Sequence, residues 1–213
     1  MFTYNALHFL IFRDRSHLFY SLFVASASAS MGVIFGFDKL LFDVSSSTTI
    51  LFLFANLGIF AVMFFSREFL RCRIHLPITN KIIVSLGLMA LLNIFVGLLF
   101  NIQNFVVIDI LILVGAFICI SGSYQRWRQG YTPARFYLLS WGILAVSAAL
   151  WIAFVHGFSS NFVAKHSLLI GIAIEVILVA MAMAESINVL RNEMNQTLAQ
   201  ANTKLELRVK EEA

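Results

Sequence analysis

Charged residues are scarce in this 213-residue sequence, where Asp, Glu, Lys and Arg together make up 12% of the chain. Soluble globular proteins carry about a quarter of their residues charged. Hydrophobic residues reach 60%, and Phe alone occurs 22 times. A soluble domain of this length could not hide so much apolar surface, so we expect lipid to cover part of it.

Cysteine and catalytic motifs are equally scarce. Cys72 and Cys119 are too few for a disulfide framework and form no CxxC pair. There is no nucleophile elbow, phosphate loop or HExxH motif, and no two histidines share a helix at ligand spacing. We therefore expect no catalytic residue, no metal site and no cofactor. The net charge of +4 is spread over the segments between apolar runs, which argues against a nucleic-acid partner.

Six apolar stretches approach the roughly 20 residues that a helix needs to cross a bilayer. They predict an all-α integral membrane bundle, because lipid offers backbone groups no partner outside the helix. A seventh stretch, residues 1–12, is only half as long and is either an interfacial helix or the remnant of a first span. The six stretches are residues 18–37, 48–66, 82–102, 105–123, 136–155 and 167–186.

Basic residues between these stretches predict the orientation, since they concentrate on the cytoplasmic side of membrane proteins. One side carries only Lys39 and Lys165. The other side should be cytoplasmic, which places the C-terminus inside the cell. Three of its arginines, at 126, 128 and 135, could also bind anionic lipid head groups, although orientation alone would explain them. The 13 basic residues of this side are Arg13, Arg15, Arg67, Arg71, Arg73, Lys81, Arg126, Arg128, Arg135, Arg191, Lys204, Arg208 and Lys210.

Four polar residues lie inside predicted spans, where a polar side chain is costly and therefore a functional candidate. Glu175, near the middle of the last span, must face the bundle interior, be protonated or pair. It either hydrogen-bonds to a neighbouring helix, through Asn56, Asn93 or a serine, or takes part in proton sensing or ligand contact. Asn56 and Asn93 are most simply interhelical contacts. Asp109 is expected close to the outer surface.

The composition changes sharply after the last span, where charged and amide residues dominate residues 187–213. We expect the last helix to continue out of the membrane as a cytoplasmic coupling helix. Its apolar positions form two sets offset by 11 residues, which is typical of a nearly straight coiled coil and predicts a homodimer. The alternative is a solvated amphipathic helix. The two sets are Leu190, Met194 and Leu198, then Ala201, Leu205 and Val209.

Several segments give the chain a family resemblance. They are Arg13-Asp14-Arg15-Ser16, Gly130-Tyr131-Thr132-Pro133-Ala134-Arg135, and Gly171-Ile172-Ala173-Ile174-Glu175. With them, the chain from about Tyr4 to Leu190 resembles the membrane domain of the bacterial seven-transmembrane receptors with diverse intracellular signalling modules. The resemblance implies a location in the inner membrane and seven spans with the N-terminus outside. It also implies an extracytoplasmic ligand domain before Met1, and a histidine kinase or diguanylate cyclase after Ala213.

These features predict the membrane module of a signalling sensor, with the last span passing a change in helix packing to an output domain. A small transporter or channel with Glu175 in its pathway is the alternative, although the sequence shows neither an internal repeat nor a central helix break. A membrane scaffold without signalling is a third possibility.

Overall fold

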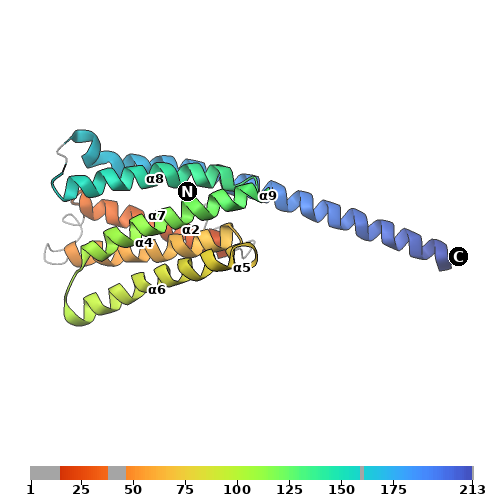
Figure 1. Ribbon diagram of the computed structural model, residues 1–213, viewed down its shortest axis with the longest axis horizontal. Coiled ribbons are helices and arrows are strands. Elements are labelled where there is room, and N and C mark those ends of the chain that lie inside the picture. The colour runs from red at the N-terminus through yellow and green to blue at the C-terminus, as the bar shows by residue number, and fades with distance from the viewer. Residues whose placement is uncertain (1–14, 38–46, 159–160, 213) are drawn as a thin grey trace.

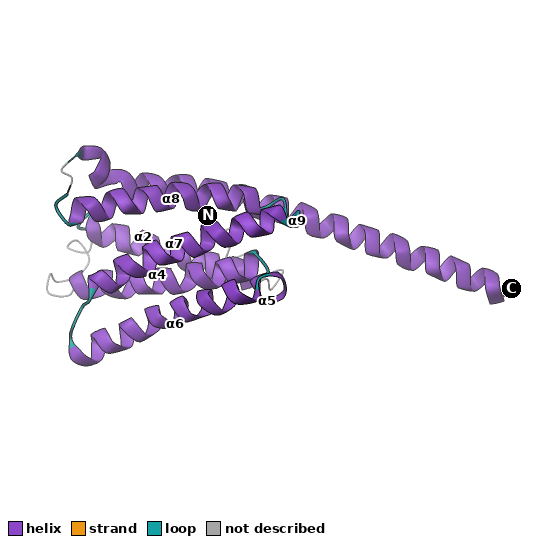
Figure 2. Cartoon of the chain, viewed as in Figure 1, coloured by secondary structure: helices purple, strands orange, loops and turns teal. Residues whose placement is uncertain are grey.

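The computed structural model describes residues 15–37, 47–158 and 161–212, and every regular element within them is a helix (Figure 2). Six of these helices are long. The seventh, α5, is a single turn between α4 and α6. The helices are α2 (Arg15–Ile34), α4 (Ser47–Phe69), α5 (Cys72–His75), α6 (Pro77–Phe100), α7 (Phe105–Arg128), α8 (Ala134–Val155) and α9 (Phe162–Glu212).

The long helices run side by side in alternating directions, and α9 extends far beyond the other helices (Figure 1). All six are long and apolar enough to cross a membrane, which confirms the predicted number of complete spans. Residues 1–12, the proposed remnant of a first span, lie outside the described residues. We call the end of the bundle that carries residues 70–76 and 129–133, where α9 emerges, the basic end.

Helix bounds differ from the apolar stretches chiefly at the basic end. There α4 continues through Arg67 to Phe69, and α7 continues to Arg128. A span reaches into the head-group region, where arginines are solvated, so the helix outlasts its apolar window. The largest difference is α9, which runs unbroken for 51 residues, about 76 Å at 1.5 Å per residue.

Direct packing divides the bundle into helix pairs. α2 packs on α4, and α8 packs on α9, while α7 contacts both α4 and α8. α6 lies against α4 and α7 and turns much of its surface outward. Its residues Leu92, Phe95 and Leu99 are more than half exposed, which suits a helix that faces lipid.

An aromatic cluster fills the basic half of the bundle and joins these helix pairs. Tyr20 of α2 contacts Phe65 of α4, with ring centroids 5.0 Å apart, and Phe65 meets Tyr137 of α8 at 5.6 Å. Offset and edge-on arrangements of this kind are the favourable ones for aromatic rings. The cluster consists of Tyr20, Phe65, Phe69, Tyr131, Tyr137 and Trp141.

Candidate functional site

Three residues of the basic end grip α9 where it leaves the bundle. The Tyr131 hydroxyl lies 2.8 Å from the Ser186 hydroxyl, and the Arg135 guanidinium lies 3.2 Å from the Glu185 carboxylate. Two residues after the end of α4, Arg71 reaches to within 3.7 Å of Glu193. We call this set the exit clamp: Arg71, Tyr131 and Arg135 with Glu185, Ser186 and Glu193.

Helical spacing places the clamped residues of α9 on one face. Glu185 and Ser186 precede Glu193 by eight and seven residues, which is two helical turns. The opposite face of α9 makes no contact with the exit clamp in this part of the helix. A grip on one face allows α9 to rotate or slide only if these contacts change.

Arg71 holds its position through an unusual backbone conformation. Its φ of 50° and ψ of 43° are left-handed, a region that costs a residue with a Cβ free energy. This turn ends α4 and begins α5. It also directs the Arg71 guanidinium to Glu193 and over the Tyr131 ring, 6.0 Å from the centroid.

Arg126 supports Tyr131 from inside the bundle. It is buried, its Nε donates to the Leu70 carbonyl at 2.9 Å, and a terminal nitrogen donates to Gln129 at 2.8 Å. The guanidinium also lies over the Tyr131 ring, 4.9 Å from its centroid. Arg126 thus satisfies a carbonyl at the end of α4 and fixes the ring that contacts α9.

Burial raises the pKa of Tyr131, although its bond to Ser186 and the charges of Arg71 and Arg126 offset part of that increase. The phenol is therefore neutral at physiological pH and can share a hydrogen bond with the Ser186 hydroxyl.

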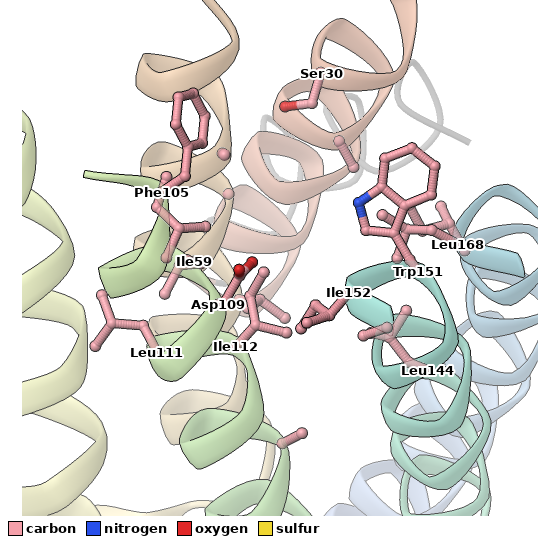
Figure 3. Close-up of a pocket in the computed structure, with 18 of the residues that line it drawn as sticks. Ser30, Ile59, Phe105, Asp109, Leu111, Ile112, Leu144, Trp151, Ile152 and Leu168 are labelled. Atoms are coloured by element: carbon pink, nitrogen blue, oxygen red, sulfur yellow. The ribbon is translucent and has the colours of Figure 1, made fainter. Parts of the chain in front are cut away.

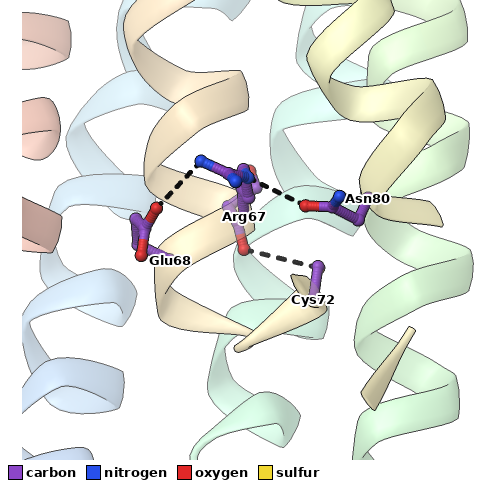
Figure 4. Close-up of polar contacts among 5 residues, drawn as sticks. Arg67, Glu68, Cys72 and Asn80 are labelled. Carbon is purple, nitrogen blue, oxygen red and sulfur yellow. Dashed lines mark hydrogen bonds and ion pairs between the residues drawn. The ribbon is translucent and has the colours of Figure 1, made fainter. Parts of the chain in front are cut away.

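A second polar group ties α4 to α6 at the basic end (Figure 4). Arg67 donates from Nε to Asn80 at 2.8 Å and pairs with Glu68 at 3.1 Å. Nearby, the Cys72 thiol lies against the Ser66 carbonyl at 3.9 Å. Burial raises the pKa of Cys72 to about 12, so this cysteine is a protonated thiol at neutral pH.

Asn56 and Asn93 contact each other. Asn93 of α6 donates from Nδ2 to the side-chain oxygen Oδ1 of Asn56 on α4 at 3.1 Å, and Asn56 donates from Nδ2 to the backbone carbonyl of Phe52 at 2.9 Å. The pair is an interhelical hydrogen bond of the kind that stabilises membrane bundles by about 1 kcal/mol.

Glu175 lies on α9 beside the aromatic cluster and is only 2% exposed. Its carboxyl is near enough to the hydroxyls of Tyr20 and Tyr137 to affect them electrostatically. The Tyr137 hydroxyl is nevertheless bonded to Ser66 at 2.6 Å, and neither asparagine bonds to Glu175. Within the described residues, one oxygen of Glu175 and the Tyr20 hydroxyl have no hydrogen-bond partner.

Asp109 of α7 lies at the end opposite the basic end, where it is partly exposed. One carboxylate oxygen is 2.9 Å from Nε2 of His156, which follows α8. Both residues line a cavity of about 310 Å³ that is otherwise almost wholly apolar and is lined by residues of α2, α4, α7, α8 and α9 (Figure 3). Trp141 and Trp151 of α8 also line it.

The remaining candidates are distributed along the basic end and α9. Arg15 begins α2, Arg73 lies in α5 and Arg128 ends α7, whereas Arg13 falls outside the described residues. Leu190, Met194, Leu198 and Ala201 are exposed on α9 beyond the bundle. Leu205 and Val209 belong to the same helix.

The sequence did not single out Ser186, Glu193, His156 or Ser30. A signal existed for the first two, because the polar residues 185, 186 and 193 share one helical face just beyond the last span. The predicted topology placed Asp109 and His156 on the same side of the membrane, but it did not predict that they are in contact. Nothing in the sequence marks Ser30 among the neighbouring serines of its helix.

The family model described as 7TM diverse intracellular signalling matches residues 1–186, which is most of the chain. No curated protein and no solved structure matches the chain.

Proposed function

The chain belongs to the 7TM diverse intracellular signalling family and is a membrane sensor domain in signalling, and we propose that it signals through α9. In this proposal a change in helix packing within the bundle moves α9 against the exit clamp. The helix then carries that movement to a cytoplasmic output domain of the histidine kinase or diguanylate cyclase type.

The observation that carries this proposal is the continuity of α9 through the clamp. The same helix packs on α8 inside the bundle, is held at Glu185, Ser186 and Glu193, and continues to Glu212. A rigid helix transmits rotation or sliding without a hinge, since each backbone amide is bonded to a carbonyl one turn away.

The arginines of the basic end support the proposed orientation. Arg71, Arg126 and Arg135 lie at the end from which α9 emerges. With this end in the cytoplasm of a cell whose inner membrane holds the protein, the positive-inside rule is obeyed. α9 then delivers its movement to the cytoplasm.

Exposed apolar residues of α9 favour a dimer. Leu190, Met194 and Leu198 are 43%, 60% and 56% exposed, and their spacing of four places them along one stripe. Such a stripe in water favours pairing with a second copy of the helix. Two bundle packings that differ by a few kcal/mol would suffice to switch a paired output.

The transporter alternative receives less support. A solute pathway through Glu175 requires an open route to its carboxyl. Glu175 is 2% exposed and does not line the cavity beside Asp109, to which α9 contributes Leu168 and Ile172.

The test fuses a diguanylate cyclase after Ala213 and compares two sets of variants. Arg71→Ala, Tyr131→Phe and Arg135→Ala each remove a clamp contact, and we expect each to change the basal cyclase output. Arg73→Ala and Arg128→Ala are matched controls, because these arginines share the basic end but have no observed contact with α9. Equal output from both sets would count against the proposal.

A further inference from the structure

Ser30 differs from three other buried serines of the bundle. Ser21, Ser66 and Ser123 each donate to the carbonyl four residues earlier in their own helix, at 2.6–2.8 Å. Ser30 is 7% exposed, yet its Oγ has no hydrogen-bond partner among the described residues. A buried hydroxyl without a partner costs free energy, so its presence requires an explanation.

Ser30 lines the cavity beside Asp109, where Asp109 provides a second polar group (Figure 3). The Asp109 carboxylate already accepts from His156 if that imidazole carries its proton on Nε2. A carboxylate has capacity for further donors, so one more hydrogen bond remains available. The other walls are aliphatic or aromatic, and they include Ile59, Leu144 and Ile152.

From this arrangement we propose that the cavity is a binding site for a small neutral amphiphile with an apolar body and one hydroxyl group. The hydroxyl meets the unpaired Ser30, while the body contacts the apolar walls. The Asp109 carboxylate disfavours an anionic head such as a fatty acid, because like charges repel in a medium of low dielectric.

The cavity volume sets the size of this ligand. About 310 Å³ lies at the lower limit for small-molecule pockets. At roughly 30 Å³ per non-hydrogen atom, the share of one water in the liquid, it holds about ten such atoms. A primary alcohol of eight or nine carbons matches this size.

The position of the cavity indicates how a bound ligand would affect the packing of the helices. It lies between the α2–α4 pair and the α8–α9 pair, and it reaches from Trp141 of the aromatic cluster to Asp109 and His156 at the opposite end. Trp141 connects the cavity to the aromatic cluster, because it lines the cavity and its ring centroid lies 6.2 Å from that of Tyr137. The inference that a ligand binds in this cavity does not depend on the proposed function. The inference that this binding is the stimulus does rest on it.

The test uses the whole chain in lipid nanodiscs with 8-bromo-1-octanol, whose bromine quenches nearby tryptophan fluorescence. In a Trp127→Phe background only Trp141 and Trp151 report, and both line the cavity. We expect saturable quenching that 1-nonanol relieves and that octanoate and nonane do not. Ser30→Ala should weaken binding about fivefold, the equivalent of one hydrogen bond, and Ser28→Ala, on the exposed side of α2, should not.

A second variant and a second quencher complete the test. Ala145→Phe fills the cavity and should abolish quenching in a protein that is still monodisperse. Nanodiscs of brominated phospholipid distinguish a free amphiphile from a bilayer chain. Quenching by that lipid which 1-nonanol leaves unchanged would overturn the proposal, as would equal binding of 1-bromooctane or of the Ser30→Ala protein. Binding without any change in the cyclase fusion would instead count against the proposed function.

Discussion

The hydroxyl oxygens of Tyr131 and Ser186 lie 2.8 Å apart, which joins the connection between α7 and α8 to the point where α9 leaves the bundle. The Tyr131 ring is in turn held by Arg126, whose Nε also donates to the carbonyl of Leu70, the residue that follows α4. Three helices therefore meet at one phenol. A change in the separation of α4, α7 and α9 must alter this contact.

Removing either hydroxyl should loosen α9 at its exit. We expect Tyr131→Phe and Ser186→Ala each to cost about 1 kcal/mol locally, which is roughly fivefold faster hydrogen exchange at amides 187–192. The double variant should exchange no faster than either single one, because both remove the same bond. Tyr124→Phe, at an exposed tyrosine of α7, is the control. Additive effects would show that the two hydroxyls act independently.

Loss of the Arg126 guanidinium should destabilise the whole bundle. Arg126→Met leaves the Leu70 carbonyl without its charged donor, and we expect a loss of about 1.5–3 kcal/mol in free energy of unfolding. Arg126→Lys should recover little, since an ammonium cannot donate to Leu70 and Gln129 in the planar geometry of a guanidinium. Denaturation in detergent measures both. Arg128→Met, at an exposed site, should be neutral, and an equally large loss there would contradict the assignment.

Gly171 permits the close approach of α8 and α9. A Cβ at this position would overlap the Ser147 side chain, whereas a Cβ at Gly142 would meet no atom within 4 Å. We expect Gly171→Ala to cost about 1–3 kcal/mol through overpacking. Gly142→Ala should be neutral or stabilising by up to about 1 kcal/mol, because alanine favours a helix. Thermal unfolding measures the stability of both variants. A shift of both unfolding temperatures in the same direction would contradict this packing.

The two native cysteines should react slowly with thiol reagents, so that a cysteine introduced on α9 can be labelled specifically. Cys72 and Cys119 are buried, and a pKa of about 12 keeps Cys72 protonated well above pH 8. Raising the pH from 7 to 9 should therefore increase maleimide labelling of an introduced Met194→Cys much more than that of Cys72. Rapid labelling of the wild-type chain would contradict the burial.

The same Met194→Cys variant tests the proposed dimer. Leu190, Met194 and Leu198 share one exposed stripe, so two copies paired along it would bring residue 194 close to its counterpart. We expect a disulfide-linked dimer under mild oxidation in membranes. Asn195→Cys, one residue along and off the stripe, is the matched control. Equal crosslinking at both positions would argue against pairing on this stripe.

Much of the fold could be predicted from the sequence because lipid imposes it. Hydrophobic length defines each span, and the alternation of arginines between spans fixes which ends lie together. The helix bounds in the structure differ from the predicted ones where residues such as Arg67 remain helical beyond the apolar stretch. Arg67 is hydrogen-bonded there to Asn80.

Side-chain partners could not be predicted in the same way. Asn56 and Asn93 were expected to join helices, but hydropathy does not say that they bond to each other rather than to Glu175. The cavity requires five helices to be placed at once, so no local pattern reveals it. The left-handed Arg71 is likewise a product of tertiary packing, because its sequence lacks the glycine that such a turn favours.

Transmission through α9 can be tested most directly by changing the rotational register of its exposed part. One to four alanines are inserted between Thr203 and Lys204 of the chain fused to a diguanylate cyclase, and cyclase output is measured in membranes. Each insertion rotates the distal helix by about 100°. We expect output to change with one and two insertions and to return toward its starting value with four. The same output at every insertion would contradict transmission through a rigid α9.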